Sequence, residues 1–222
     1  MRPLSDTTPK PLLCAGGKPL ITWHIQRLVN AGITHIVINH AWLGDQFEAQ
    51  LGNGSALGAH ITYSPENPSL ETAGGIANAL PLLGDQPFLV INGDIWCDWD
   101  PRHASSMARQ LQQQARQAWL LLVNNPDHHP SGDFILGDAD LLVPRNHQIA
   151  QKALTFAGIG IYQPRFFMST PAGQKAPLAP LLREAIEKGM VLGHHYTGRW
   201  TDVGTPERLA QLDRCLSKPV IP

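Results

Sequence analysis

An aspartate at the end of an apolar run is the first feature of the sequence that suggests chemistry. The run Phe88 to Asn92 is typical of a buried strand in a parallel sheet, because such strands are covered on both faces. Gly93 and Asp94 follow it directly, so we expect the Asp94 carboxylate at the carboxyl edge of the sheet, where open α/β folds bind ligands. A hard divalent cation suits such a carboxylate. The alternative, that Asp94 only caps a turn, stays open from these residues alone.

Three further segments, far apart in the sequence, could contribute to the same site. Pro9-Lys10-Pro11 lies near the start, Leu70 to Gly75 precedes an expected helix, and Asp202 precedes the last expected helix within WTDVGTPE. Each of the first two has a simpler interpretation. Lys10 could be an exposed loop lysine, and the glycines could only begin a helix.

Other motifs are weaker. The glycines of residues 52–58 resemble a dinucleotide fingerprint faintly, but they follow a helix rather than a strand. The adjacent pairs His128-His129 and His194-His195 would point to opposite faces of a strand, so we interpret them as histidines without a metal role. The sequence contains neither a GxSxG elbow nor a CxxC pair, so it supports neither covalent catalysis by serine nor a zinc site.

The elements that must position these residues alternate between helix and strand, which predicts an α/β fold. We expect strands at 33–39, 60–64, 88–92 and 119–124, and helices at 19–32, 42–51, 74–83 and 101–117. After Asn125 the pattern changes to a mixed-sheet lobe that could cover a substrate. It has expected strands at 134–136, 141–143, 154–162 and 191–196, and helices at 178–188 and 205–216. We predict a single domain over residues 1–222.

Composition excludes several functional classes. The chain has 222 residues, 43% of them apolar, and a formal net charge of -1. A core of useful size is therefore expected, and a partner that needs many cationic contacts, such as nucleic acid, is not. Three separated cysteines fit a reducing compartment, and no apolar run approaches a membrane span. We expect a cytoplasmic monomer that acts on small molecules.

Six segments carry a more specific resemblance. The chain is similar to bacterial sugar-1-phosphate nucleotidyltransferases in MRPLSDTTPKPLL, KPLITWHIQRLVNAGI, HIVINHAWLG, SPENPSLETAGGI, LVINGDIWCD and WTDVGTPERL, in that order. The resemblance implies a Rossmann-like, three-layer (GT-A-like) α/β fold, with a mostly parallel central sheet and a small mixed-sheet sugar-binding lobe. It also implies UTP and a sugar 1-phosphate as substrates, with Mg²⁺ as the metal.

The resemblance assigns roles to particular residues. Lys10 and Asp94 are the implied catalytic residues, and Asp94 and Asp202 the implied Mg²⁺ ligands. The implied nucleotide-binding residues are Lys10, Glu66, Thr72, Ala73, Gly74, Gly75 and Gly93. The implied sugar-binding residues are Asn125, Asp133 and Gly158, although Asp133 could equally be a turn residue. Three alternatives stay open: another sugar substrate such as glucose or mannose 1-phosphate, a catalytically silent sugar-nucleotide-binding protein, and a glycosyltransferase.

One departure from the family pattern concerns the beginning of the chain. Members of the family begin with a buried strand and a glycine-rich phosphate loop of the form LAAGxGxRM, and this sequence opens at the final methionine. We expect a misplaced start codon. We also expect the 222-residue product to be poorly soluble or inactive, because the neighbours of a missing central strand, among them residues 33–39 and 88–92, would have unpaired backbone groups.

Overall fold

Two units make up the fold in the residues that the computed structural model describes, 1–145 and 152–217. Unit 1 consists of Met1–Ser69, Asn92–Arg102 and Arg199–Pro222, and unit 2 consists of Leu70–Ile91 and His103–Gly198. Both units therefore combine segments that are distant in the sequence. No helix in the described part of the chain is both long and apolar enough to cross a lipid bilayer.

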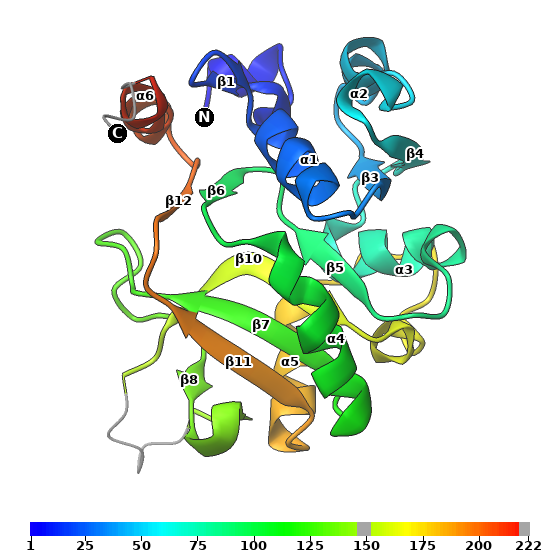
Figure 1. Cartoon of the computed structure of the whole chain (residues 1–222), viewed down its shortest axis with the longest axis vertical. Coiled ribbons are helices and arrows are strands. Elements are labelled where there is room, and N and C mark those ends of the chain that lie inside the picture. Colours follow the sequence, from blue (N-terminus) through cyan, green and yellow to red (C-terminus); the bar gives the residue numbers. More distant parts are fainter. Residues whose placement is uncertain (146–151, 218–222) are drawn as a thin grey trace. The chain divides into compact units, whose positions relative to one another are not determined.

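Unit 2 contains a four-stranded sheet with the order β11-β7-β10-β5. Its strands are β5 (Phe88–Ile91), β7 (Ala118–Val123), β10 (Thr155–Tyr162) and β11 (Val191–Tyr196). β11 is parallel to β7, and β10 is antiparallel to both β7 and β5. Strands β5, β7 and β11 consequently run in one direction, and their carboxyl ends lie at one edge of the sheet (Figure 1).

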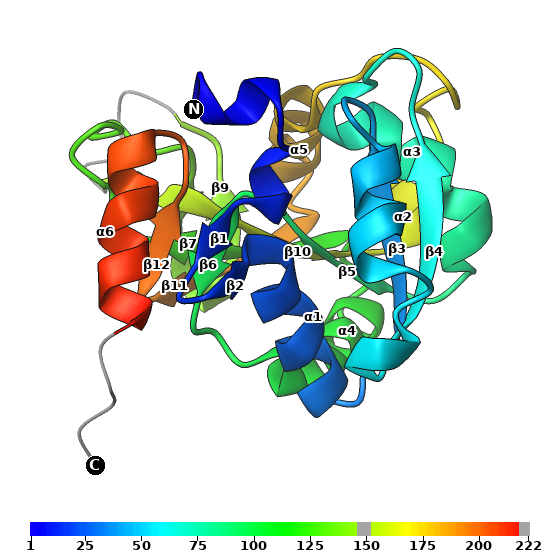
Figure 2. The ribbon, with the colours of Figure 1, turned by 90° about the horizontal axis from the view of Figure 1, so that it is seen from above.

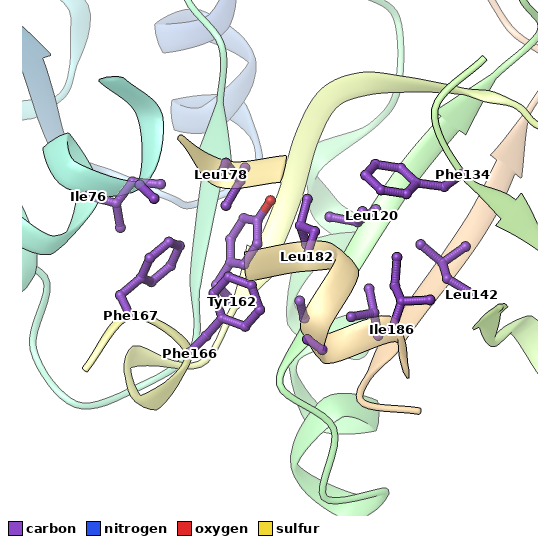
Figure 3. Packing of buried hydrophobic residues seen from close by; sticks show 14 of the residues in the cluster. Ile76, Leu120, Phe134, Leu142, Tyr162, Phe166, Phe167, Leu178, Leu182 and Ile186 are labelled. Carbon is purple, nitrogen blue, oxygen red and sulfur yellow. The ribbon is translucent and has the colours of Figure 1, made fainter. Parts of the chain in front are cut away.

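Both faces of this sheet are covered, which explains why all six residues of β7 are buried. α4 (Ala104–Gln113) lies in front of the sheet and α5 (Leu178–Glu187) behind it in Figure 1. On the α5 side, Leu120 packs in one apolar cluster with Leu182 and Ile186 (Figure 3). The remaining elements of unit 2 are α3 (Glu71–Leu83), β8 (Ile135–Leu136), β9 (Leu142–Val143) and the short 3-10 helices η4 (Pro101–His103), η5 (Asp138–Asp140) and η6 (Pro164–Phe167), η4 beginning in unit 1.

Unit 1 is built around short pairs of strands. β3 (His35–His40) and β4 (His60–Pro65) are parallel and pack against α1 (Leu20–Asn30) and α2 (Asp45–Leu51), visible together in Figure 2. β6 (Ile95–Cys97) and β12 (Trp200–Asp202) are antiparallel, and α6 (Pro206–Leu216) follows β12. The smaller elements are β1 (Cys14–Ala15), β2 (Lys18–Pro19), η1 (Leu4–Asp6), η2 (Lys10–Leu12) and η3 (Ser55–Leu57).

Most of the predicted elements are confirmed, with bounds that differ by a few residues, but two of the expectations about strands are wrong. β5 is not a buried parallel strand, because it lies at the edge of the described sheet, pairs antiparallel with β10 and is only partly buried. The change of pattern at Asn125 does not separate two sheets either. β5 and β7 precede Asn125 and share one sheet with β10 and β11, which follow it.

Two further differences affect the predicted site. The helix expected at 74–83 begins at Glu71, so Thr72 to Gly75 lie in its first turn and not in a loop before it. The strands β6 and β12 were not expected. Each has three residues, which is too short for a periodic apolar pattern to appear in the sequence.

Candidate functional site

Lys10 and Asp94, which are 84 positions apart in the sequence, lie side by side in unit 1. The Lys10 Nζ atom is 3.6 Å from Asp94 Oδ2, and both side chains are nearly half exposed. Gly93 allows this approach, because a Cβ atom there would lie only 2.8 Å from Pro11 Cγ. The glycine before the aspartate thus lets the turn that carries Lys10 pack against the residues after β5.

Asp202 is brought to the same part of unit 1 by strand pairing. Asp202 is opposite Ile95 in the β6–β12 pair, and the Val203 backbone N–H donates to the Asp94 carbonyl oxygen at 2.8 Å. The backbones that carry the two aspartates are therefore hydrogen-bonded neighbours. The structure thus brings together three residues that the sequence placed in separate segments, namely Lys10, Asp94 and Asp202.

A buried histidine fixes the strand that follows Asp94. His24 of α1 is almost fully buried, and its Nε2 atom lies 2.8 Å from the Ile95 carbonyl oxygen. Burial lowers the pKa of His24 from 6.5 to about 4, against a smaller opposing effect of its bond to Ile95. The ring is therefore neutral at pH 7 and donates from Nε2.

Glu66 also lies in unit 1, directly after β4. Its backbone N–H donates to the His40 carbonyl oxygen at 2.8 Å, and its Oε1 atom accepts from Asn39 Nδ2 at 3.3 Å. Glu66 is thus held at the carboxyl ends of two parallel strands, β3 and β4.

The predicted nucleotide-binding segment Thr72 to Gly75 belongs to unit 2 and packs against protein backbone. The N–H groups of Ala73 and Gly74 both donate to the Ala176 carbonyl oxygen, at 3.0 and 3.1 Å. A Cβ atom at Gly74 would lie 2.2 Å from the Gln174 carbonyl oxygen. Close packing within unit 2 therefore accounts for the small residues Ala73 and Gly74, and contact of the segment with a nucleotide stays a prediction.

The predicted sugar-binding residues Asn125 and Asp133 have extensive hydrogen bonds within unit 2. Asn125 Nδ2 donates to the carbonyl oxygens of Pro130 (3.0 Å) and Ala153 (2.9 Å), and its Oδ1 accepts from Thr155 Oγ1 (2.9 Å). Asp133 Oδ2 accepts from the Phe156 N–H at 2.8 Å. The fold thus uses the polar atoms that were expected to contact the sugar.

Gly158, the third predicted sugar-binding residue, lies in an irregular stretch of β10. The pairing register of β10 with β7 shifts between Phe156 and Gly160, and Gly158 has a φ of +76°. Other residues rarely adopt this backbone conformation, so strand geometry alone accounts for the glycine.

Comparisons with known proteins agree with this architecture. The family model described as nucleotidyl transferase matches residues 1–138. The chain is 54% identical to N-acetylmuramate alpha-1-phosphate uridylyltransferase of Neisseria meningitidis over 213 residues, which cover 95% of this chain and 90% of that protein. The chain belongs to the nucleotidyl transferase family.

Two further comparisons extend this result. The protein of the same name from Caulobacter vibrioides is 33% identical over 93% of this nucleotidyl transferase chain and 88% of its own length. A solved Bacillus anthracis structure, described as a candidate glucose-1-phosphate thymidylyltransferase, superimposes with a TM-score of 0.81 at 21% identity. It covers 100% of this chain and 92% of its own. The family and the α/β nucleotidyltransferase fold expected from the sequence are thereby confirmed.

The donor set around Asp94 and Asp202 is chemically suited to Mg²⁺ in a nucleotidyl transferase. Mg²⁺ prefers oxygen ligands, keeps most of its waters and takes only one or two carboxylates from the protein. Asp94 and Asp202 meet that requirement, since strand pairing holds their backbones together. Within residues 1–145 and 152–217, no cluster of three or more His, Cys, Asp or Glu side chains forms a larger metal site.

One residue beside this donor set was missed from the sequence. Arg208 of α6 places Nη1 2.9 Å from Asp202 Oδ2 and 3.0 Å from Oδ1, with both side chains partly buried. Gly204 makes room for this pair, because a Cβ atom there would lie 2.2 Å from Arg208 Nη2. The only signal in the sequence is the spacing in Thr205-Pro206-Glu207-Arg208, where Thr205 caps α6 and accepts from the Arg208 N–H.

Proposed function

We propose that this protein transfers the uridylyl group of UTP to N-acetylmuramate α-1-phosphate. An oxygen of the sugar phosphate forms a bond to the α-phosphorus of UTP, the bond from that phosphorus to the bridging oxygen breaks, and pyrophosphate leaves. The products are the UDP-sugar and pyrophosphate. The observation that carries the proposal is 54% identity, over 95% of the chain, to a protein named for this reaction.

The arrangement of Lys10 and Asp94 supports a role for both in handling the triphosphate. Phosphoryl-type displacements need few covalent steps from the protein, which mainly positions groups and neutralises charge. Lys10 is a half-exposed point charge on a long stem, and it is only loosely paired with Asp94. It can therefore turn from the carboxylate to a phosphate oxygen without the cost of exposing a buried group.

Asp94 and Asp202 would hold the metal that the family resemblance implies. Mg²⁺, when bound, supplies positive charge to the phosphate oxygens. Each carboxylate already lies beside a cationic side chain, Asp94 at 3.6 Å from Lys10 and Asp202 at 2.9 Å from Arg208, so each is presented with a balancing charge. The protein's own contribution is to keep the two acids adjacent through the β6–β12 pairing and the bond from Val203 to Asp94.

The remaining predicted contacts belong to the same proposal. Glu66, Gly93 and Thr72 to Gly75 would contribute to nucleotide binding, and Asn125, Asp133 and Gly158 would shape the part of the protein that receives the sugar. We further propose that both units act as one nucleotidyltransferase domain in a monomer. The reaction would serve peptidoglycan recycling in the cytoplasm, where nucleoside triphosphates are available.

A pyrophosphate-release assay over a matrix of substrates tests the proposal. The purified protein is incubated with Mg²⁺, one of UTP, GTP or dTTP, and one of N-acetylmuramate, N-acetylglucosamine, glucose or mannose 1-phosphate. We expect the highest kcat/KM for UTP with N-acetylmuramate 1-phosphate, and a UDP-sugar of matching mass. A preference for GTP with mannose 1-phosphate would replace the proposed substrates, whereas binding of UDP-sugar without turnover of any pair would favour a silent binding protein.

A further inference from the structure

The loop between β7 and Phe134, residues 126–133, is anchored to the rest of unit 2 by several hydrogen bonds. The side-chain amide of Asn125 donates to the carbonyl oxygens of Pro130, within the loop, and Ala153, outside it. Gly132 lies so close to these groups that a Cβ atom would be 2.6 Å from the Ala153 carbonyl oxygen, and its φ is +61°. The loop is therefore held by the bond from Asn125 to Pro130 and by close packing at Gly132, as expected of a preformed binding element.

The position of this loop in unit 2 suits a ligand. It begins where β7 ends, and β7 runs parallel to β11, so the loop leaves the sheet at the edge where the carboxyl ends lie. Open α/β sheets bind their ligands at that edge.

The loop presents an oriented histidine. His129 Nε2 lies 3.0 Å from Asp133 Oδ1, while the other Asp133 oxygen accepts from the Phe156 N–H. Asp133 is thus fixed to the backbone and in turn fixes the imidazole ring. In the described part of the chain, His129 Nδ1 has no hydrogen-bond partner. A protonated ring would donate from Nε2 to Asp133 and from Nδ1 to an anion.

An arginine reaches the same loop from outside it. Arg145 Nη2 donates to the Ser131 carbonyl oxygen at 2.7 Å, and its side chain is exposed. A guanidinium group has five N–H donors in a planar fork that matches a carboxylate, and among the described residues Arg145 uses one of them, toward Ser131, so it is able to bind a carboxylate. Two cationic or protonatable groups therefore contact loop residues, His129 from within the loop and Arg145 from outside it.

We propose that His129 and Arg145 determine specificity by binding the carboxylate of an acidic sugar, with Asn125 and Asp133 as positioning residues. This inference rests on the proposed function. N-Acetylmuramate differs from N-acetylglucosamine by a lactyl ether that ends in a carboxylate, which is the group such a pair recognises. Asn125 and Asp133 act through the loop, because the fold already uses their polar atoms.

The test compares two substrates that differ only in this group. The kcat/KM values for N-acetylmuramate 1-phosphate and N-acetylglucosamine 1-phosphate are measured with UTP for the wild type, His129→Gln and Arg145→Gln. We expect the ratio of the two values to fall at least about tenfold in each variant, since a hydrogen bond between charged groups is lost. The loss should appear in the KM for the acidic sugar.

Matched controls are available within the chain. Arg165→Gln removes an arginine whose Nη2 also donates to backbone carbonyl oxygens, those of Ala115 and Arg116, and His60→Gln removes an exposed histidine of β4. Both should keep the wild-type ratio. Asp133→Asn should lower the ratio, a result that a purely structural role would not produce. Thermal melts of every variant identify any that fail to fold. His129→Gln and Arg145→Gln test the proposal independently of each other.

The outcomes distinguish a failure of this inference from a failure of the proposed function. If the wild type prefers the acidic sugar and both variants keep its ratio within twofold, the inference is overturned and the proposed function stands. If the wild type shows no preference for the acidic sugar, both are overturned.

Discussion

Two sets of acidic and amide side chains, one in each unit, are held in opposite ways. Asp94 and Asp202 in unit 1 are paired with the side chains of Lys10 and Arg208. Asn125 and Asp133 in unit 2 are bonded mainly to backbone groups, and each has one side-chain partner as well, Thr155 and His129. A side-chain cation can exchange its partner by a rotamer change, whereas a backbone partner moves only with the chain. The first set is thus suited to bind a ligand. The second set is suited to hold the surrounding backbone in place, and we call such residues frame residues.

The largest effect should come from the two aspartates. Asp94→Asn and Asp202→Asn should each lower turnover by about 10²-fold or more, because each removes a charge from a predicted Mg²⁺ ligand. Two ligands of one ion act as a unit, so the double variant should be little worse than the poorer single one. Turnover is measured across a Mg²⁺ titration. Asp100→Asn, which removes an acid paired with Arg102, is the control. Full activity of Asp202→Asn would remove that residue from the site.

Lys10→Met separates chemistry from stability. Turnover should fall about 10- to 100-fold, because the variant loses a charge that stabilises the phosphates. The free energy of unfolding should change by less than about 0.5 kcal/mol, since exposed ion pairs contribute little. Urea unfolding and steady-state kinetics measure the two effects. Lys188→Met, which breaks an exposed pair with Glu184, should change neither. A destabilisation of Lys10→Met by about 2 kcal/mol would show that Lys10 is a frame residue, which stabilises the fold.

Asn125→Ala should mainly lower stability, in contrast to Lys10→Met, which should mainly lower turnover. It leaves the Ala153 and Pro130 carbonyl oxygens and the Thr155 hydroxyl without their partner, and so should lower the free energy of unfolding by about 1 to 3 kcal/mol. Asn124→Ala is the control, because Asn124 is exposed and, among the described residues, its side chain accepts from that of His195. If Asn125→Ala is as stable as the wild type but its KM for the sugar phosphate rises about 100-fold, Asn125 is a ligand and not a frame residue.

This difference between the two sets could not be predicted from the sequence. Asp94 could be located, because an apolar run ends at it and glycine precedes it. The closing helix was also predictable, because Thr205, Pro206 and Glu207 form a standard helix start. The partners of Asn125 are different: Ala153 and Thr155 lie 28 and 30 residues away, at positions set by the pairing of β7 with β10. No local pattern records such contacts.

The edge position of β5 could not be predicted from the residues of this strand alone, for a related reason. A four-residue apolar strand has the same composition whether one neighbour or two pair with it, so Phe88 to Ile91 indicated burial that the described sheet does not provide. The short strands β6 and β12 are similar: the contact of Asp202 with the Asp94 segment depends on a pairing between residues 95–97 and 200–202. The residues of the candidate site could therefore be predicted from the sequence, and the contacts that position each of them could not.

The pH dependence of stability at His24 tests whether a side chain bonded to backbone also lies beside the aspartates of unit 1. Its Nε2–H donates to the Ile95 carbonyl oxygen, and burial lowers its pKa from 6.5 to about 4. The unfolded chain therefore binds a proton between these values and the folded chain does not, so stability should be complete above pH 6.5 and fall as the pH decreases toward 4. Between pH 7 and 5 the loss from this residue should be roughly 2 kcal/mol. His24→Gln keeps a donor near the same position without the titration, so its unfolding free energy should vary less with pH over this range. Urea unfolding of both proteins at several pH values makes the comparison. Identical pH dependence in the two would mean that His24 does not stay neutral in the fold, and that the strand after Asp94 is held by other contacts.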